Sequence, residues 1–345
     1  MSKMLGVGMI GCGEIAYSAS GKAVQEAKNA EVVIAMDTVS SVAESFAETY
    51  NCRHTTDVSE VLASDDVDAV VISAPHFLHE PLTLQAAAAG KHVMCEKPIA
   101  CTLEQADRMI DACKEANVLL AINLVSRFET GTLKAKELIE AGVIGKVIAM
   151  QFHVMVDKPE TYWTGGYSGR VTTDWRMSKE KSGGGVMVMN LVHDFDRFRF
   201  MTGLEPVRVS CEYDTFLTET EVEDYISAVY RFDNGAIATA TASSAARGKG
   251  GRGNRILGTH GQISFEKWGM LEVFATEEKA GLKAGEWNQI ELERGGNSRA
   301  HYTEQFADAV FNGGAAPIPG EEGRKTLAMI DSAYRAGETH QTVTI

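Results

Sequence analysis

The first third of the chain alternates short apolar runs with longer stretches of helical character. The apolar runs predict strands over residues 4–10, 31–36, 68–73, 92–95 and 118–122. The intervening stretches predict helices, among them residues 39–50, 81–89 and 102–116. Strands that alternate with helices in this way form a parallel, doubly wound sheet with helices on both faces.

The pattern changes near residue 123, where long runs with alternating apolar positions replace the strand–helix alternation. After a predicted helix over 132–141, strands are predicted over residues 147–156, 207–215, 225–232, 236–242, 256–257, 262–265 and 271–274. Asp233-Asn234-Gly235 between two of these runs predicts a hairpin. Closing helices are predicted over residues 302–312 and 324–336. These runs indicate a mainly antiparallel sheet that is open on one face.

At 345 residues the chain is long for a single core, so two domains are expected. We place a doubly wound α/β domain of the Rossmann type over residues 1–122. An α/β domain with the open-faced sheet follows over residues 123–345.

A glycine-rich turn follows the first predicted strand, where Gly11, Gly13 and Ala16 stand in the order used for dinucleotide binding. Gly11 permits the tight turn, and Gly13 lets the backbone approach a pyrophosphate. Ala16 keeps the following helix close to the strand. A plain strand-to-helix turn can also contain two glycines, so the motif depends on its context.

Asp37 supplies that context, because it ends the second predicted strand at about the distance expected for a ribose-binding acid. Thr38, Val39, Ser40 and Ser41 follow without an Arg or Lys to neutralise a 2′-phosphate, which favours NAD over NADP. The alternative is that Asp37 caps the helix over residues 39–50. The two interpretations are compatible.

Composition restricts the partners. The formal net charge of −14 argues against nucleic acids or an anionic membrane surface. We find no apolar run of about 18 residues and no signal peptide, so a cytoplasmic protein is expected. The six cysteines lack paired spacing and are expected to be reduced and mostly buried.

Two segments are rich in glycine. Residues 161–170 combine Gly, Thr and aromatic residues, as in a loop that folds over a ligand. Residues 247–255 are basic within an acidic chain. This second segment is either a solvated hairpin loop or a flap that brings cations, such as Arg252 and Arg255, to an acidic substrate or a subunit contact.

The tetrapeptide Cys95-Glu96-Lys97-Pro98 follows the strand over residues 92–95. Ligands of doubly wound sheets bind at the carboxyl ends of the strands, so Lys97 is expected beside the cofactor. An ammonium there can orient a substrate hydroxyl and stabilise a developing alkoxide. Glu96 could fix the ribose or the lysine. A surface Lys–Glu pair is the alternative.

Residues 70–79 and 89–98, together with Gly183-Gly184-Gly185, His193 and Asp196, make the chain resemble the glucose–fructose oxidoreductase/inositol dehydrogenase/MocA family along its whole length. The resemblance implies a Rossmann domain joined to an open-faced α/β domain that binds the substrate and usually forms oligomers through its sheet. It also implies NAD(P)-dependent oxidation or reduction of sugars and cyclitols.

The resemblance further implies roles for individual residues. It assigns pyrophosphate contacts to Gly11, Cys12, Glu14 and Ile15, in line with Gly13 above, and the ribose to Asp37. It places Ala74, Pro75, His79 and Glu96 along the cofactor. Lys97 matches the catalytic lysine and His193 the active-site histidine. His76 stands where relatives often have Asn, and a metal site formed by His76 and His79 is not expected.

The chain departs from the family pattern at Met189, where relatives usually carry an Asp four residues before the histidine. Asn190 or Asp194 would then take a polar role, or the proton relay would run through Lys97 and His193 alone. A histidine held structurally by Asp196 is the alternative for His193. Further pocket candidates are His153, Asp174 and the proposed substrate-binding residues Arg127, Trp163, Trp175, Arg176 and Asn190.

These features favour an NAD-dependent oxidoreductase that transfers a hydride between nicotinamide and a hydroxyl or keto carbon of a sugar, sugar derivative or cyclitol. An alternative is a relative that retains NAD and uses transient oxidation for elimination, hydrolysis or epimerisation. A non-catalytic regulator that senses NAD or sugar is the third hypothesis. We expect a homo-oligomer, dimer or tetramer.

Overall fold

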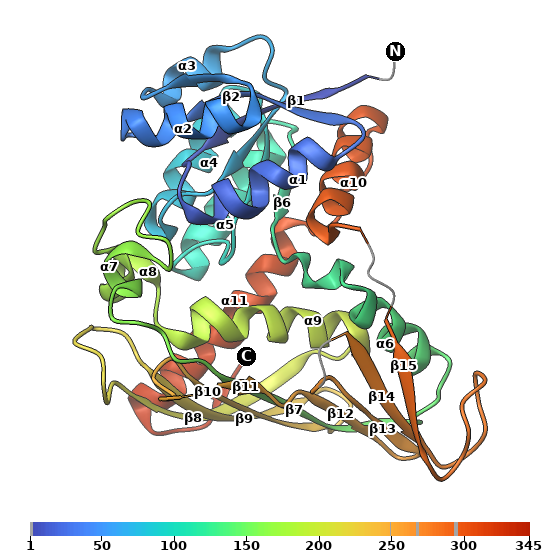
Figure 1. Ribbon diagram of the computed structural model, residues 1–345. Coiled ribbons are helices and arrows are strands. Elements are labelled where there is room, and N and C mark those ends of the chain that lie inside the picture. Colours follow the sequence, from blue (N-terminus) through green and yellow to red (C-terminus); the bar gives the residue numbers. More distant parts are fainter. Residues whose placement is uncertain (1–2, 249, 267–268, 293–295) are drawn as a thin grey trace. The chain divides into compact units, whose positions relative to one another are not determined.

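The computed structural model describes residues 3–248, 250–266, 269–292 and 296–345 (Figure 1). The chain forms two compact units that do not follow the sequence as two continuous halves. Unit 1 comprises Met1–Val125, Pro159–Gly183 and Gly296–Leu327, and unit 2 comprises Ser126–Lys158, Gly184–Gly295 and Ala328–Ile345. Each unit is described by itself.

Unit 1 contains a six-stranded parallel sheet in the order β3-β2-β1-β4-β5-β6, which confirms the doubly wound prediction. Its strands are β1 (Leu5–Ile10), β2 (Ala30–Met36), β3 (Arg53–Thr55), β4 (Ala69–Ile72), β5 (His92–Cys95) and β6 (Leu120–Ile122). Every residue of β1 and β4 is buried. Continuous burial of this kind requires cover on both faces of the sheet, and helices provide it.

The helices of unit 1 include η1 (Ala16–Ser20), α1 (Gly21–Glu26), α2 (Ser40–Tyr50), α3 (Val58–Ala63), η2 (His76–Leu78), α4 (His79–Ala88), α5 (Leu103–Glu115) and α10 (Ser298–Asn312). The start of α5 shows why the sequence forms a helix there. Thr102 Oγ1 accepts from the Gln105 backbone N–H, and Gln105 Oε1 accepts from the Thr102 N–H. This reciprocal capping box fixes the first turn.

Unit 2 contains a larger sheet in the order β15-β14-β13-β12-β7-β10-β9-β8-β16, with β11 paired to β7. Its strands are β7 (Val147–Met155), β8 (Pro206–Asp214), β9 (Tyr225–Phe232), β10 (Ile237–Ser243), β11 (Gly251–Arg252), β12 (Arg255–Gly258), β13 (Gly261–Ser264), β14 (Met270–Ala275), β15 (Trp287–Glu291) and β16 (Val343–Thr344). Only β7 and β10 pair in parallel among these described strands, so the sheet is mainly antiparallel as predicted. The predicted Asp-Asn-Gly hairpin joins β9 to β10, with Gly235 at φ +89°.

One face of the second sheet packs against helices. Phe152 of β7 contacts Phe195 and Phe198 of α9 (Val192–Thr202), with ring centroids 5.4 and 4.7 Å apart. α6 (Thr130–Glu140) packs beside α9 (Figure 1). The other face is uncovered, because alternate residues of β9 and β10, such as Val229 and Ile237, are exposed. The sheet is therefore open on one face.

Several elements escaped the sequence pattern, and they are short or polar. β3 has three residues and an exposed Arg-His pair, and β15 alternates exposed and half-buried positions without a buried residue. All six cysteines are free thiols. No helix in the described residues is both long and apolar enough to span a membrane.

Candidate functional site

The glycine loop after β1 has the geometry that its sequence predicts. Gly11 has φ +89°, and its N–H donates to the Met36 carbonyl over 2.8 Å. A Cβ at Gly11 would lie 2.5 Å from the Ser73 carbonyl oxygen, so packing against the end of β4 demands glycine. A Cβ at Gly13 would meet no atom within 4 Å. The loop is therefore open at Gly13, where a phosphate group could approach the backbone.

Asp37 is tied to this loop. Its Oδ2 accepts from the Cys12 N–H over 2.9 Å, and its Oδ1 accepts from the Val39 N–H over 3.0 Å. The capping position of α2 is Val39 and not Asp37, so the structure does not use the acid as the cap of that helix. Each carboxylate oxygen can accept a second hydrogen bond, which leaves capacity for ribose hydroxyls.

The residues between and after the two glycines differ in exposure. Cys12 is buried, its thiol donates to the Met36 carbonyl, and burial raises the pKa of this thiol well above its usual value. Ile15 is 46% exposed, which leaves an apolar side chain uncovered beside the open side of Gly13. Glu14 Oε2 accepts from the Tyr167 N–H over 2.9 Å.

Lys97 follows β5 and precedes a cis bond to Pro98. Burial lowers the pKa of its ammonium to about 8. The Glu96 carboxylate opposes this shift, whereas the positive charges of Arg299 and Arg176 reinforce it. Lys97 can therefore exchange a proton close to neutral pH, which an ordinary lysine cannot do.

Glu96 is held by a polar cluster inside unit 1. Its Oε1 accepts from Ser20 Oγ at 3.0 Å, Asn123 Nδ2 at 3.0 Å and Arg299 Nη1 at 2.8 Å. Burial alone would raise the pKa of Glu96, but Arg299, Asn123 and Lys97 together hold it below its usual value. Glu96 is consequently an anion fixed next to Lys97.

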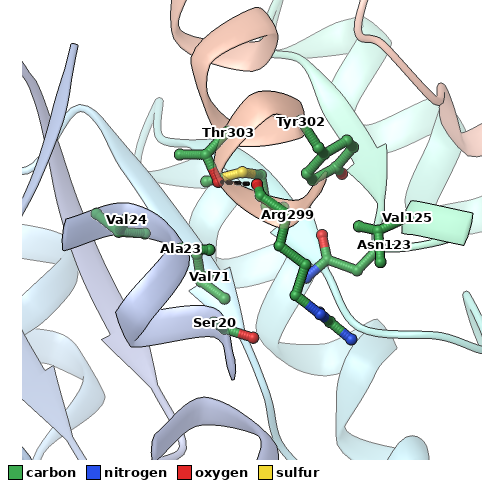
Figure 2. A pocket seen from close by; sticks show the side chains of 10 residues that line it. Ser20, Ala23, Val24, Val71, Asn123, Val125, Arg299, Tyr302 and Thr303 are labelled. Carbon is green, nitrogen blue, oxygen red and sulfur yellow. Dashed lines mark hydrogen bonds between the residues drawn. The ribbon is translucent and has the colours of Figure 1, made fainter. Parts of the chain in front are cut away.

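A small cavity lies behind this cluster. Figure 2 shows Ser20, Asn123 and Arg299 around it, with Tyr302 on the α10 side. Its volume of about 10 Å³ is near the minimum for one water molecule. Asn123 Oδ1 is buried and finds no hydrogen-bond donor among the described residues, so a water there would satisfy it. The cavity supports Glu96 and is too small for a substrate.

His79 braces the loops that follow β4 and β5. It is fully buried, with Nδ1 2.8 Å from the Pro98 carbonyl oxygen and Nε2 3.0 Å from the Ala74 carbonyl oxygen. Burial lowers its pKa although both carbonyls favour the protonated ring. Ala74, Pro75 and Glu96, all predicted along the cofactor, belong to these two loops. His79 thus links the loop of Pro75 to the loop of Lys97.

Aromatic and cationic side chains gather near His76. The His76 ring lies 4.4 Å from the Trp175 ring, and its Nδ1 lies 2.7 Å from the Ser182 carbonyl oxygen. Burial lowers the pKa of His76 well below its usual value, so the ring is neutral at physiological pH. The Arg176 guanidinium lies 4.6 Å from the Trp175 ring and 5.2 Å from the Tyr162 ring.

Trp163, another predicted substrate residue, is buried in α7 (Tyr162–Gly165) and contacts Tyr162. Trp175 and Arg176 stand in η4 (Trp175–Met177). All three residues belong to the segment of unit 1 that the sequence inserts between β7 and the glycine triplet. Unit 1 therefore brings together Lys97, the glycine loop and the predicted tryptophan–arginine pair.

The remaining predicted residues belong to unit 2. Met189 and Asn190 stand in η5 (Met187–Leu191), and His193 is half-buried about one turn later in α9. The buried Lys158 places its Nζ 3.6 Å from the Met189 thioether sulfur. The neighbour of the unusual methionine is therefore a cation. Asn190 Oδ1 is buried without a hydrogen-bond partner in the described part of the chain.

The glycine triplet before η5 has packing reasons. Gly184 has φ +142°, and a Cβ there would lie 2.0 Å from Tyr334 Oη. A Cβ at Gly185 would lie 2.0 Å from the Glu223 carbonyl oxygen. The buried Glu223 carboxylate accepts from the N–H groups of Gly185 at 2.7 Å and Met187 at 2.9 Å. It fixes the backbone that leads to His193.

Three other predicted pocket residues, Arg127, Asp194 and His153, are either paired within the protein or exposed on the sheet. Arg127 donates to both carboxylate oxygens of Asp196, from Nε at 2.8 Å and Nη2 at 2.5 Å, and both side chains are buried. Asp194 accepts from Arg197 and Asn254. His153 is exposed on β7, on the face opposite Phe152.

The basic loop is partly neutralised. Arg247 pairs with Asp157 at 3.2 Å and Arg255 with Glu266 at 2.7 Å. Lys249 and the side chain of Arg252 lie outside the described part of the structure. Asp174, the last pocket candidate, pairs with Lys181 at 3.0 Å.

Sequence reasoning missed four residues that the structure places at these features, namely Lys158, Arg170, Glu223 and Arg299. Only Arg170 had a signal, because it ends the glycine-rich segment over residues 161–170. The described residues contain no group of three or more His, Cys, Asp or Glu side chains that could hold a metal ion.

Comparisons with known proteins identify the family of this chain. Residues 5–124 match the model of an oxidoreductase family with an NAD-binding Rossmann fold (GFO_IDH_MocA), and residues 132–264 match the GFO/IDH/MocA C-terminal domain. The chain is 35% identical to 1,5-anhydro-D-fructose reductase of Ensifer adhaerens over 234 residues, 67% of each protein.

Two further similarities extend the comparison. A 2,7-anhydro-N-acetylneuraminate hydratase of Mediterraneibacter gnavus is 30% identical over 60% of this chain, a match that spans about half (52%) of that relative. The structure of aldose-aldose oxidoreductase from Caulobacter crescentus, complexed with glycerol, superimposes with a TM-score of 0.86 at 25% identity and covers 99% of this chain and 100% of that chain. The chain therefore belongs to the glucose–fructose oxidoreductase/inositol dehydrogenase/MocA family of oxidoreductases.

Proposed function

We propose that this protein transfers a hydride between a nicotinamide cofactor and a hydroxyl or keto carbon of a sugar, sugar derivative or cyclitol. The observation that carries the proposal is Lys97, whose pKa is lowered to about 8 at the carboxyl end of β5. Two relatives support the proposal by their names, which are 1,5-anhydro-D-fructose reductase and aldose-aldose oxidoreductase. The family membership alone would not assign a reacting residue.

We propose NAD as the cofactor in preference to NADP. The open side of Gly13 and the exposed Ile15 fit a dinucleotide, and the Asp37 carboxylate fits two ribose hydroxyls but would repel a 2′-phosphate. When bound, NAD supplies the nicotinamide carbon that accepts or donates the hydride. Gly11, Cys12, Gly13, Glu14 and Ile15 form the loop proposed to hold its pyrophosphate.

Lys97 is the proposed proton carrier. Oxidation of an alcohol removes a proton from the hydroxyl as the hydride leaves, and reduction returns one. A lysine with a pKa of about 8 populates both protonation states near neutral pH and can serve both directions. The anionic Glu96 beside it keeps the ammonium form accessible.

His193 is the proposed second acid or base, since imidazole is the side chain most often used in general acid–base catalysis. His193 lies on α9, and the Glu223 carboxylate accepts a hydrogen bond from the backbone N–H of Met187 shortly before this helix. These contacts fix the main chain that carries His193. Met189 cannot ionise and so cannot carry a proton in the way that the usual Asp would. Lys97 and His193 are therefore the two proton carriers proposed here. Asn190 is proposed to bind substrate hydroxyls.

Trp163, Trp175 and Arg176 are proposed to recognise the sugar ring. Aromatic faces pack against the C–H faces of sugars, and a guanidinium donates to hydroxyl groups. Arg127 was predicted for the same role. Its bidentate pair with Asp196 favours instead a contribution to the packing of α9.

We propose that the uncovered face of the second sheet forms a homo-oligomer. Val229 is 49% exposed and Ile237 41% exposed on this face, between polar side chains. Exposed apolar groups that lie together indicate an association surface. Light scattering of the wild type and of Val229→Glu tests this point, and an unchanged mass for the variant would contradict it.

A second function, internal redox recycling with a retained cofactor, is favoured by Met189. Elimination or hydration chemistry needs acids and bases placed differently from those of a simple dehydrogenase, and here Lys158 stands beside the residue that replaces the Asp. One relative is named a hydratase. The two functions differ in whether free NADH accumulates.

The test incubates purified protein with NAD and a panel of sugars, sugar acids and cyclitols, following both NADH and substrate. Lys97→Ala is compared with Lys22→Ala, which removes a 59% exposed lysine of α1. NADH that depends on Lys97 supports the dehydrogenase. Substrate loss that depends on Lys97 without net NADH supports internal recycling. Turnover that survives in Lys97→Ala contradicts both.

A further inference from the structure

Residues 159–183, here called the strap, belong to unit 1 although the sequence inserts them between strands and helices of unit 2. The strap carries α7 and α8 (Lys179–Ser182) (Figure 1). α8 packs against η2. The Tyr167 N–H donates a hydrogen bond to the Glu14 carboxylate in the glycine loop, and the Ser182 carbonyl oxygen lies in hydrogen-bond distance of His76 Nδ1 after β4. The strap thus runs along the carboxyl edge of the parallel sheet.

Arg170 fastens the strap at the glycine loop. Its Nε donates to the Cys12 carbonyl over 2.9 Å, and its Nη2 donates to the Val42 carbonyl over 3.2 Å. A longer contact of 3.5 Å joins Nη1 to Ser45 Oγ. The guanidinium also lies 3.9 Å from the centre of the Tyr17 ring. Arg170 therefore touches the loop, the first helical segment and α2.

The charge balance at this loop makes a cation necessary if the ligand carries a diphosphate. Two acids already stand at the loop, Asp37 on the Cys12 N–H and Glu14 two residues later. A dinucleotide adds about two negative charges with its diphosphate to a loop that already holds these two acids, so a cation is needed to offset the repulsion. A guanidinium has five N–H groups, of which three have acceptors in the described part of the chain.

We propose that Arg170 is a cofactor-binding residue, whose guanidinium pairs with the diphosphate of the dinucleotide while it keeps its contacts with the glycine loop and α2. The inference rests on the proposed function only in taking a dinucleotide as the ligand. Arginine suits this role because its planar fork can keep backbone acceptors on one edge while it offers N–H groups to phosphate on another.

The test measures the dissociation constants of NAD, ADP and adenosine for the wild type, Arg170→Gln and Arg170→Lys by calorimetry. ADP contains the diphosphate and adenosine does not. We expect Arg170→Gln to weaken NAD and ADP about tenfold to hundredfold and to leave adenosine within about twofold. Arg170→Lys keeps the charge and should recover part of the loss. Added salt should weaken ADP less in Arg170→Gln than in the wild type.

The matched control is Arg53→Gln, which removes an exposed arginine of the same unit that pairs with Asp66. It should bind all three ligands as the wild type does. An equal loss for ADP and adenosine in Arg170→Gln, or no loss, would overturn the proposal, because a purely structural clasp would not distinguish them. If Arg170→Gln does not fold, the dissociation constants of ADP and adenosine are compared in Arg170→Lys instead.

These binding experiments need no substrate turnover, so they separate this inference from the proposed function. Unchanged ADP binding in Arg170→Gln, together with turnover that requires Lys97, would reject the role of Arg170 alone. A wild type that binds neither NAD nor ADP would reject the dinucleotide itself, and the proposed function with it.

Discussion

The Arg299 guanidinium lies 2.8 Å from the Glu96 carboxylate, although more than two hundred positions separate them in the sequence. The pair is largely buried, with 19% and 8% of the two side chains exposed. Glu96 directly precedes Lys97 in the chain. Burial has the largest effect on the pKa of Lys97 and lowers it; Glu96 raises this pKa and Arg299 lowers it further, so the pair adjusts the proton affinity of the proposed catalytic amine.

Replacing Arg299 with Met should therefore raise the pKa of Lys97, since the opposing cation is lost and the Glu96 anion remains. The rise of the pH–rate profile for alcohol oxidation should therefore move to higher pH. Breaking a buried ion pair should also lower the free energy of unfolding by about 3 kcal/mol. The pH profile of kcat/KM and chemical denaturation check these effects. A profile identical to that of the wild type would show that Arg299 has no influence on Lys97.

His79→Leu tests the brace between the two loops. The change leaves the carbonyls of Ala74 and Pro98 buried without the imidazole, which should cost about 2 kcal/mol of stability. Turnover should fall as well, because Pro98 follows Lys97 directly. His79→Gln, which keeps an N–H donor, should lose less. Equal unfolding midpoints for His79→Leu and the wild type would contradict the bracing role.

Gly184→Ala tests the packing reason for the glycine triplet. The new Cβ would meet Tyr334 Oη at 2.0 Å and occupy a φ of +142° that side chains rarely adopt, so we expect a loss above about 2 kcal/mol. Gly203→Ala is the control, because Gly203 also has positive φ but open space around its Cβ position. Its loss should be near 1 kcal/mol. Equal losses in denaturant unfolding would refute the steric explanation.

Asp37→Ala tests cofactor choice. Loss of the carboxylate removes the proposed acceptor for the ribose hydroxyls and should weaken NAD about tenfold to hundredfold. NADP should lose less or gain, since the repulsion of its 2′-phosphate disappears. Asp66→Ala, at a 74% exposed acid in the same unit, is the control. If Asp37→Ala lowers the affinity for both cofactors equally, the carboxylate only supports the loop.

The sequence predicted the parallel sheet because its strands are continuous apolar runs between helices, a signal that β1 and β4 show through complete burial. The same reasoning selected Gly11 and Asp37, which directly follow β1 and β2, and Lys97, which stands two residues after β5. Short or polar strands such as β3 gave no comparable signal, and their pairing depends on the neighbouring strand.

Partners that lie far apart along the chain could not be predicted from local pattern. In the sequence, Arg299 is an ordinary arginine of a predicted helix, and only the packing of α10 brings it to Glu96. Lys158 has the sequence context of a surface lysine, although the structure places it beside Met189. The contact of Arg170 with the glycine loop depends on the strap being part of unit 1, which the sequence pattern does not indicate. Each of these depends on tertiary contacts that one sequence does not encode in its spacing.

The measurement that tests the central claim most directly is the pH dependence of NADH formation in a single turnover with the responding substrate. The neutral amine of Lys97 accepts the hydroxyl proton, so the rate should rise as pH increases through about 8 and then level off. Lys97→Ala should be about a thousandfold slower and should lack this limb. A Lys97→Ala variant with the wild-type rate and the same limb would contradict the assignment of Lys97 and the mechanism built on it.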